Sequence, residues 1–352
     1  MKILLITIRS DYGGGPRHVD QLVKCLPSNC ELYLAYPKEG VPYAKMWTND
    51  KRIKGTIFVP YRKFSLSALC QLRRFVNKNE IGIIHSHGNG AGLYSRLLKL
   101  TGVKAKVVHT FHGISDDYSS KLKYLMSLVV GRLLEPLANK YIAVSNGEKA
   151  LGVNRGFCTE NNCIVVYNGI LDERFRAVGL GSRTIVTLSR YDYQKNMSLC
   201  LDIVRLMKDE GYRFLWVGDG EDYAVMKVAV EKEKLPVNMV GFQTKPMKFL
   251  AKSAVYLSSS RFEGLPYALI EASSIGLPIV ATDVKGNNEV AINDENGLTF
   301  NTAEEGAAAL RRILSNKQEY ERMSINSRKL FEERFTIDVM IDDLLKVYKA
   351  LA

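Results

Sequence analysis

Residues 13–23, GGGPRHVDQLV, follow the apolar run KILLITI at residues 2–8 and open directly onto a helical pattern. Three consecutive glycines lose much backbone entropy on folding, so their presence needs a reason. They could form a tight turn between a strand and a helix. They could also leave room for a large anionic ligand to approach backbone amides at the N-terminus of the helix. Both interpretations predict a β–α unit at the start of the chain.

The same alternation of short apolar runs and amphipathic stretches continues along the chain. In the first half, helical patterns such as residues 67–79 and 92–102 separate the strand candidates, which are KILLITI (2–8), CELYLAY (30–36), GTIFVPY (55–61), IGIIHSH (81–87), KVVHTFHG (106–113) and KYIAVS (140–145). The second half repeats the scheme with RTIVTLS (183–189), FLWVGDG (214–220), VNMVGF (237–242), AVYLSSS (254–260) and PIVATDV (278–284). This pattern predicts an α/β fold with parallel sheets covered by helices on both faces.

A chain of 352 residues is longer than one core usually supports, so we expect two domains. Turn residues in VVYNGILDERFRAVGLGSRTIV place the boundary after residue 170. The prediction is an N-terminal doubly wound domain at 1–170 and a second one at 171–335. A long amphipathic helix at 336–352 should pack back on the first domain. In such sheets the ligand lies beyond the carboxyl ends of the strands.

Composition is that of a soluble globular protein, with 46% apolar and 24% charged residues. No stretch approaches the roughly 20 apolar residues that a membrane span needs. The apolar run that follows Met1 and Lys2 is too short for a signal peptide. The six cysteines are scattered without a CxxC pair, which favours free thiols in a reducing cytoplasm.

The net charge of +12 is concentrated in the first half of the chain. Residues 1–170 hold 24 Lys and Arg against 11 Asp and Glu, and they also hold all five histidines. This asymmetry favours an anionic partner, such as a membrane surface, a nucleic acid or a phosphorylated ligand, although a solvated basic surface without a partner would look the same. For a membrane, FSLSALCQLRRFVNK (64–78) with Lys63, Arg73 and Arg74 is the expected contact, because it combines apolar and basic residues.

Motifs for nucleophilic hydrolysis, P-loops and metalloproteases are missing, and the first glycine loop departs from GxGxxG. Polar residues at strand ends remain. Arg190 and Lys195 follow the strand at 183–189 and can hold a diphosphate between two cations. In RFEGLPYALIEA (261–272), Glu263 precedes a turn, and Glu271 lies within a helix that starts near Pro266. Carboxylates beside an anion site favour a ligand that carries hydroxyls as well as phosphates.

Together these segments resemble glycosyltransferase family 4, whose members are retaining enzymes with the GT-B architecture of two Rossmann-like domains facing across a cleft. The resemblance covers nearly the whole chain. Its strongest part is the Glu-x7-Glu motif FEGLPYALIEAS. The other matching segments are GGGPRHVDQLVK, HTFHG, YIAVSN, SRYDYQKN, VGDGE, GLPIVATDVKGNNEVAINDENGL and, on the acceptor side, IIHSHGNGAGLYSRLL.

The resemblance implies roles for individual residues. Arg190 and Lys195 would neutralise the diphosphate, Glu271 would bind ribose hydroxyls, and Glu263 would bind hydroxyls of the transferred sugar. His112 would lie near the anomeric centre. The remaining implied positions are donor-binding Gly14, Gly15, Gly218, Gly264, Leu265 and Pro266, and acceptor-side His85, His87 and Asp117.

The implied activity is retaining, metal-independent transfer of a hexose from a nucleotide sugar to a lipid-linked or glycan acceptor in the assembly of O-antigen, capsule or exopolysaccharide. A UDP-sugar is favoured as donor and GDP-mannose is second. No cofactor or nucleic acid is expected, and the protein should lie in the cytoplasm on the inner face of an anionic membrane. Two alternatives remain, a non-hydrolysing UDP-N-acetylglucosamine 2-epimerase and a basic nucleic-acid-binding protein.

Overall fold

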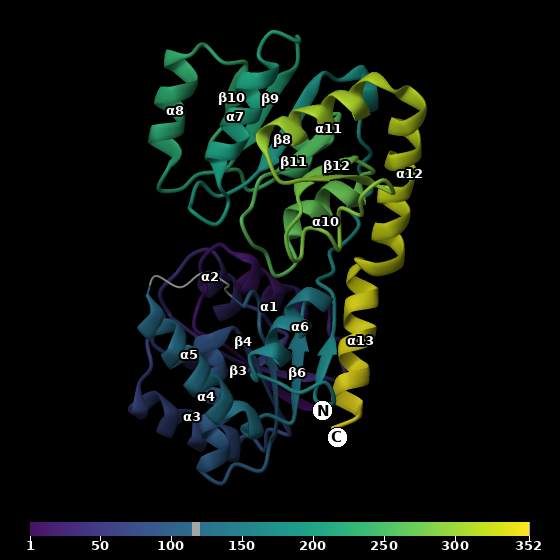
Figure 1. Ribbon diagram of the computed structural model, residues 1–352. Helices are drawn as coiled ribbons and strands as arrows, with labels where there is room; N and C mark the ends of the chain where they lie inside the picture. Colours follow the sequence, from purple (N-terminus) through teal and green to yellow (C-terminus); the bar gives the residue numbers. More distant parts are fainter. Residues whose placement is uncertain (115–119, 352) are drawn as a thin grey trace. The chain divides into compact units, whose positions relative to one another are not determined.

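The computed structural model describes residues 1–114 and 120–351. The chain divides into two compact units, and each is built on its own parallel sheet (Figure 1). Unit 1 comprises Met1–Asn168 and the C-terminal segment from Ile337 onwards, and unit 2 comprises Gly169–Thr336. The chain therefore passes from one unit to the other twice.

Unit 1 contains a seven-stranded sheet in the order β3-β2-β1-β4-β5-β6-β7. Its strands are β1 (Lys2–Thr7), β2 (Glu31–Tyr36), β3 (Ile53–Phe58), β4 (Ile83–His87), β5 (Lys106–Thr110), β6 (Lys140–Ala143) and β7 (Cys163–Val165). Its helices are α1 (Gly14–Cys25), α2 (Tyr43–Thr48), α3 (Leu66–Lys78), α4 (Asn89–Leu100), α5 (Lys121–Leu134), α6 (Asn146–Asn154) and α13 (Ile337–Lys349), with a 3-10 turn at Glu135–Leu137.

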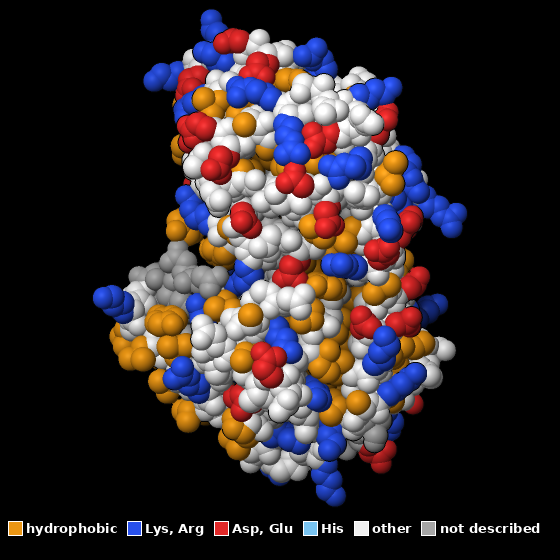
Figure 2. Space-filling model, turned by 45° about the vertical axis from the view of Figure 1, so that its right-hand side comes forward, with side chains coloured by type: hydrophobic (Ala, Val, Ile, Leu, Met, Phe, Trp, Pro, Cys, Tyr) orange, Lys and Arg blue, Asp and Glu red, His pale blue; other side chains and the backbone are white. Residues whose placement is uncertain are grey.

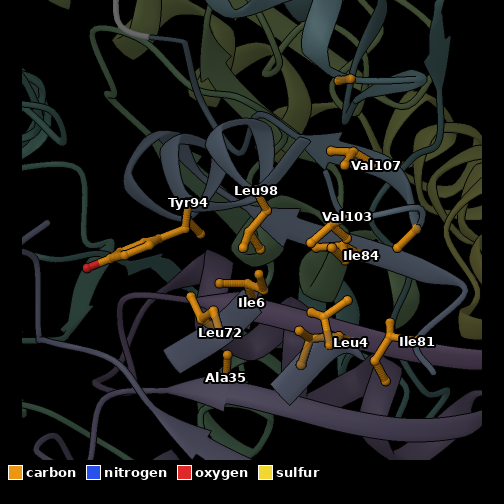
Figure 3. Packing of buried hydrophobic residues seen from close by; sticks show 14 of the residues in the cluster. Leu4, Ile6, Ala35, Leu72, Ile81, Ile84, Tyr94, Leu98, Val103 and Val107 are labelled. Atoms are coloured by element: carbon orange, nitrogen blue, oxygen red, sulfur yellow. The ribbon is translucent and has the colours of Figure 1, made fainter. Parts of the chain in front are cut away.

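Both faces of this sheet are buried, which explains why β1 is apolar at nearly every position. Successive side chains of a strand point to opposite faces. Leu4 and Ile6 join a cluster that includes Leu72 of α3 and Leu98 of α4 (Figure 3). Ile3 and Leu5 join a second cluster, on the face that α1 and α13 cover.

Unit 2 contains a six-stranded sheet in the order β10-β9-β8-β11-β12-β13. Its strands are β8 (Thr184–Leu188), β9 (Arg213–Val217), β10 (Val237–Met239), β11 (Val255–Ser258), β12 (Ile279–Thr282) and β13 (Gly297–Phe300). Its helices are α7 (Met197–Met207), α8 (Tyr223–Lys232), α9 (Met247–Leu250), α10 (Tyr267–Ser274), α11 (Ala303–Ser315) and α12 (Lys317–Arg334), with a 3-10 turn at Gly179–Gly181.

The two sheets share one winding scheme. In each, the first strand of the unit (β1 or β8) pairs on one side with the next strand and on the other with the fourth (β4 or β11). The chain segments that follow these two neighbouring strands therefore run to opposite sides of the sheet. Such a switch point leaves a crevice beyond the carboxyl ends of the two strands. The predicted pair of doubly wound Rossmann-like domains is confirmed. The short strands β7 and β13 were not predicted.

Most apolar side chains of α3 face the core. Its apolar residues Ala68, Leu69, Leu72 and Val76 are buried in the core of unit 1, whereas Arg73 and Arg74 are exposed. Leu66, seven and eight positions before these arginines, is 70% exposed and lies on the same face, so the predicted membrane contact through this helix stays a prediction. Across the described part of the chain, no helix has both the length and the apolar composition needed to span a bilayer.

Candidate active site

A small pocket in unit 2 lies at the switch point between β8 and β11. The carboxyl ends of these two strands and the first turn of α10 form its walls. It is lined by Thr187, Leu188, Ser189, Lys195, Tyr256, Ser258, Ser259, Ser260, Glu263, Pro266, Ala268 and Leu269. Two charged residues predicted from the sequence, Lys195 and Glu263, thus face the same space.

Lys195 and Glu263 form an ion pair, with 2.5 Å between Nζ and Oε1. Their side chains are 17% and 7% exposed, so the pair is largely removed from water. Ser260 donates a hydrogen bond from Oγ to the same carboxylate oxygen at 2.7 Å. A buried pair is stable only where such further hydrogen bonds accompany it. The arrangement fixes both charges at the edge of the sheet.

Gln194 connects this pair to Arg190. Its Nε2 donates to the other carboxylate oxygen of Glu263 at 3.2 Å, and its Oε1 accepts from the Arg190 guanidinium at 3.1 Å. Arg190 is half exposed and also pairs with Asp192 at 2.9 Å. The two predicted cations therefore belong to one hydrogen-bonded network, although only Lys195 lines the pocket. Sequence reasoning did not single out Gln194.

The loop that carries these residues is held from both ends. Asn196 adopts a left-handed conformation with φ of 52° and starts α7. The backbone amide of Lys195 donates to the side chain of Asp192 at 3.0 Å. Ser259 donates from Oγ to the Lys195 carbonyl at 2.9 Å, and the Arg261 amide donates to the Gln194 carbonyl at 2.8 Å. The loops after β8 and β11 are thus fastened to each other.

The Glu-x7-Glu segment continues into α10. Pro266 precedes the first residue of this helix in an extended conformation, and Leu265 and Glu271 are both buried. Gly286, which the sequence analysis missed, has φ of 84°, and a Cβ there would lie 2.4 Å from the carbonyl oxygen of Gly264. Glycine at position 286 therefore lets a second loop close against the Gly264 turn.

Gly218 has a structural reason to lack a side chain. It has φ of 143°, and a Cβ would lie 1.8 Å from the carbonyl oxygen of Ser189. The Ser189 amide donates to the Val217 carbonyl at 3.0 Å, so the loops that follow β8 and β9 are in direct backbone contact. Gly218 therefore supports the loop that precedes Arg190.

In unit 1, His112 lies just beyond the end of β5, with φ of 63°, a region that residues other than glycine rarely adopt. The next two amides, of Gly113 and Ile114, donate to Oε1 of Glu148 at 2.5 and 2.9 Å. The Val144 amide donates to Oε2 at 2.9 Å. Glu148 is fully buried near the start of α6 and fastens the His112 turn to the end of β6. The sequence analysis did not identify it.

The glycine loop brings α1 to the same place. The helix starts at Gly14, so the amides of Gly14 and Gly15 belong to its first turn, where no intrahelical acceptor exists. A Cβ at Gly15 would lie 4.0 Å from Cδ2 of His112. The structure thus gathers Gly15, His112 and the positive end of α1 at the switch point of the first sheet.

Three histidine rings meet at this point. Nδ1 of His87 lies 3.1 Å from Nε2 of His112, and the His18 ring lies 4.6 Å from the His112 ring between centroids. Burial lowers the pKa of His18 to about 4, opposed by the hydrogen bond that its ring donates to Asn168. Burial also lowers the pKa values of His87 and His112, and neighbouring histidines add to the effect. All three imidazoles are therefore neutral near pH 7.

The remaining predicted acceptor-side residues lie elsewhere. His85 is fully buried, and its nitrogens lie 2.6 Å from the Tyr348 hydroxyl of α13 and 2.7 Å from that of Thr110. An acceptor would have to displace one of these partners to reach His85. His109 of the HTFHG segment, another candidate for an acceptor role, is likewise buried, with its Nδ1 at 3.0 Å from the Ser86 hydroxyl. Asp117 lies outside the described residues.

Two family models match consecutive parts of the chain. Residues 12–174 match the model for Glycosyltransferase Family 4, and residues 172–330 match the model for Glycosyl transferases group 1. The chain belongs to glycosyltransferase family 4. The resemblance noted in the sequence is thereby confirmed, and the protein is a glycosyltransferase.

Among curated family members, the amylovoran biosynthesis glycosyltransferase AmsD of Erwinia amylovora is 26% identical over 90% of each chain. The UDP-Gal:alpha-D-GlcNAc-diphosphoundecaprenol alpha-1,3-galactosyltransferase of Escherichia coli is also 26% identical, over 80% of this chain and 79% of its own. The fold is similar to that of Anabaena Alr3699/HepE in complex with UDP, with a TM-score of 0.85, 17% identity and coverage of 99% and 100% of the two chains. The GT-B architecture is thus shared.

Proposed function

We propose that this glycosyltransferase moves a hexose from a UDP-sugar to a lipid-linked acceptor in the biosynthesis of a surface polysaccharide, with retention of configuration and without a metal ion. The observation that carries the proposal is the buried Lys195–Glu263 pair, linked through Gln194 to Arg190 at the switch point of unit 2. This network offers positive charge for a diphosphate and carboxylate oxygens for sugar hydroxyls side by side. The family matches favour transfer over the epimerase alternative.

The donor roles follow from hydrogen-bonding capacity. An ammonium has three N–H donors, so the bond from Lys195 to Glu263 leaves donors for a phosphate oxygen. Arg190 supplies a second, half-exposed cation from the same loop. Glu263 accepts from hydroxyls of the transferred sugar, and buried Glu271 accepts from the ribose. Amides around Gly264 and Leu265, at the start of α10, orient the donor.

In the transfer step the bond between the sugar C1 and the β-phosphate oxygen breaks, and its electron pair stays on the diphosphate. An acceptor hydroxyl forms the new bond to C1 from the same face, and its proton passes to an oxygen of the leaving phosphate. Charge on the diphosphate develops beside Lys195 and Arg190, where preorganised cations stabilise the transition state. His112 and the first-turn amides of Gly14 and Gly15 belong to unit 1 and contact the sugar and diphosphate in this proposal, with His87 on the acceptor side.

The UDP donor and the polyprenyl acceptor rest on similarity. One relative is named for UDP-galactose and a diphosphoundecaprenol acceptor, another for amylovoran biosynthesis, and a solved structure with the same fold holds UDP. A thermal-unfolding panel with UDP, GDP, ADP and their sugars tests the donor. A nucleotide at about 100 times its Kd stabilises the folded state by about 2.7 kcal/mol. UDP should shift the midpoint most, and a larger shift with GDP would replace UDP by the second donor.

Transfer is expected to persist in excess EDTA, because Lys195 and Arg190 occupy the place where a metal would otherwise neutralise the diphosphate. Initial rates with and without chelator, measured with the donor that the panel selects, check this. Loss of activity in EDTA and recovery with Mg²⁺ or Mn²⁺ would contradict the proposed mechanism.

A larger apolar surface for membrane contact is offered by α5. Six of its apolar side chains are between 45% and 71% exposed, namely Leu122, Leu125, Met126, Val129, Val130 and Leu133. Most of them recur at helical spacing along one face. Hydrophobic side chains gather at the left-hand edge of Figure 2, where this helix lies, with Lys and Arg at the margin. The positive charge of the first half of the sequence suits an anionic leaflet.

Replacing Leu122, Leu125 and Val129 together by serine should weaken binding to vesicles that contain anionic lipid by about tenfold or more, because each apolar side chain contributes about 1.5 kcal/mol or more on burial. Co-sedimentation at low and high salt measures the effect. The matched control is Val225→Ser with Val228→Ser, since both valines are exposed on α8 of unit 2. Equal loss in the control, or binding that is the same for neutral and anionic vesicles, would contradict membrane contact through α5.

A further inference from the structure

The histidine cluster of His18, His87 and His112 has the geometry of a metal site. One ring nitrogen of each residue lies within 4.8 Å of the others. The three come from α1, β4 and the turn after β5, so the fold, rather than a sequence motif, brings them together. A tetrahedral ion with metal–nitrogen bonds of about 2.0–2.1 Å would need its ligand nitrogens about 3.4 Å apart. The pair His87 Nδ1 and His112 Nε2 is already at 3.1 Å.

The surroundings of the cluster support ligation. Nδ1 of His18 lies 3.2 Å from Oδ1 of Asn168, which is itself buried. Ligating histidines commonly use one nitrogen for such a bond, which orients the other nitrogen toward the metal. His87 is more than nine-tenths buried, and among the described residues its Nε2 has no hydrogen-bond partner. The cluster is therefore not a closed hydrogen-bond network. His112 is only half-buried, so an ion can reach the cluster from solvent on that side.

The donor set decides which ion fits. Three imidazoles without a carboxylate suit Zn²⁺, Co²⁺, Ni²⁺ and Cu²⁺, whereas Mg²⁺ and Ca²⁺ prefer oxygen ligands. Three protein ligands also leave the fourth tetrahedral position to water.

We propose that the histidine cluster binds a transition-metal ion of the zinc type and that the bound ion inhibits glycosyl transfer. The inhibition rests on the proposed function, because it requires His112 to contact the donor sugar; the metal site itself does not. A bound ion would engage Nε2 of His112 and place positive charge and a water molecule beside the first turn of α1. This inhibitory ion differs from a catalytic metal, for which Lys195 and Arg190 substitute in the proposed mechanism.

The site is tested by titrating Co²⁺ into the full-length protein and recording its visible absorption. Wild type should give the intense bands of tetrahedral cobalt, which Zn²⁺ removes and Mg²⁺ does not. His18→Gln and His87→Gln should each weaken binding by more than tenfold, and Asn168→Ala by about 10- to 100-fold. Unfolding midpoints without metal show whether each variant is folded. Unchanged binding in folded His18→Gln, or thiolate-to-cobalt bands that indicate cysteine ligands, would overturn the site.

Inhibition is tested with His18→Gln, because His18 has no role in the proposed transfer. At donor concentrations well below KM, Zn²⁺ should inhibit wild type with a midpoint equal to its binding constant, and EDTA should restore the rate. His18→Gln should keep transfer and lose sensitivity to Zn²⁺ by more than tenfold. Zinc binding without inhibition would overturn the inhibitory role. If no donor is turned over, the proposed function fails, and the cobalt titration still decides whether the cluster binds metal.

Discussion

Replacing Lys195 by alanine is expected to lower kcat by about 10² or more, since a preorganised charge that stabilises the leaving group is usually worth that much. The variant should also be less stable. Lys195 is the ionic partner of Glu263, and its loss leaves a carboxylate that is 7% exposed without its counter-charge. Breaking a buried ion pair in this way typically costs about 3–5 kcal/mol. Steady-state kinetics and urea unfolding measure the two effects separately.

A double variant separates catalysis from folding. Lys195→Met with Glu263→Gln removes both charges of the pair while keeping the side-chain volumes similar, so stability should return most of the way to wild type. Its kcat should remain at least as low as that of Lys195→Ala. The surface control is Lys227→Ala on α8, whose exposed ion pair with Glu231 at 3.9 Å contributes little. Recovery of activity together with stability would exclude Lys195 from the stabilisation of the diphosphate.

The sequence was sufficient for the fold because the central strands of both sheets are buried on both faces. The runs ILLI (3–6) and AVYL (254–257) are apolar, and their alternation with helical patterns predicts doubly wound sheets with the ligand beyond the carboxyl ends of the strands. Lys195 and Glu263 could be predicted as site residues because each follows closely after an apolar run that the sequence marks as a strand. Short strands such as β13 (Gly297–Phe300) carry too little pattern to be recognised.

The omissions concern contacts between distant residues. The helical period of α3 shows that it is amphipathic, but only the packing shows that its apolar side faces the core. His85 sits near a strand end like His87, yet Tyr348, which is 263 positions later, covers it. Glu148 looks like a solvated glutamate in the first turn of a helix. Two of the three amides that it accepts from, those of Gly113 and Ile114, lie 35 and 34 positions earlier, so local spacing does not reveal that it holds the His112 turn.

Glu148→Ala should lower the free energy of unfolding by about 3–5 kcal/mol, because the amides of Gly113, Ile114 and Val144 lose a charged acceptor in the interior. Urea denaturation measures this. The matched control is Glu160→Ala, which removes an exposed carboxylate paired with Lys149 at 2.9 Å and should change stability by less than about 0.5 kcal/mol. An equal loss in the two variants would contradict a special role for Glu148.

Glu148→Ala also tests whether Glu148 positions His112 or only stabilises the fold. Glu148 holds the turn in which His112 keeps its left-handed conformation, so alanine should release that histidine from the sugar site. Transfer should then fall by at least about tenfold in kcat/KM, as misplacement near reacting atoms commonly does. The Kd for UDP should change by much less than the rate, because the side chains proposed to bind the nucleotide, those of Glu271, Lys195 and Arg190, belong to unit 2. Glu148→Gln should recover part of the rate, since its amide oxygen can still accept from Gly113 and Ile114. A parallel loss of UDP affinity, or full activity in the alanine variant, would show that Glu148 does not act through His112.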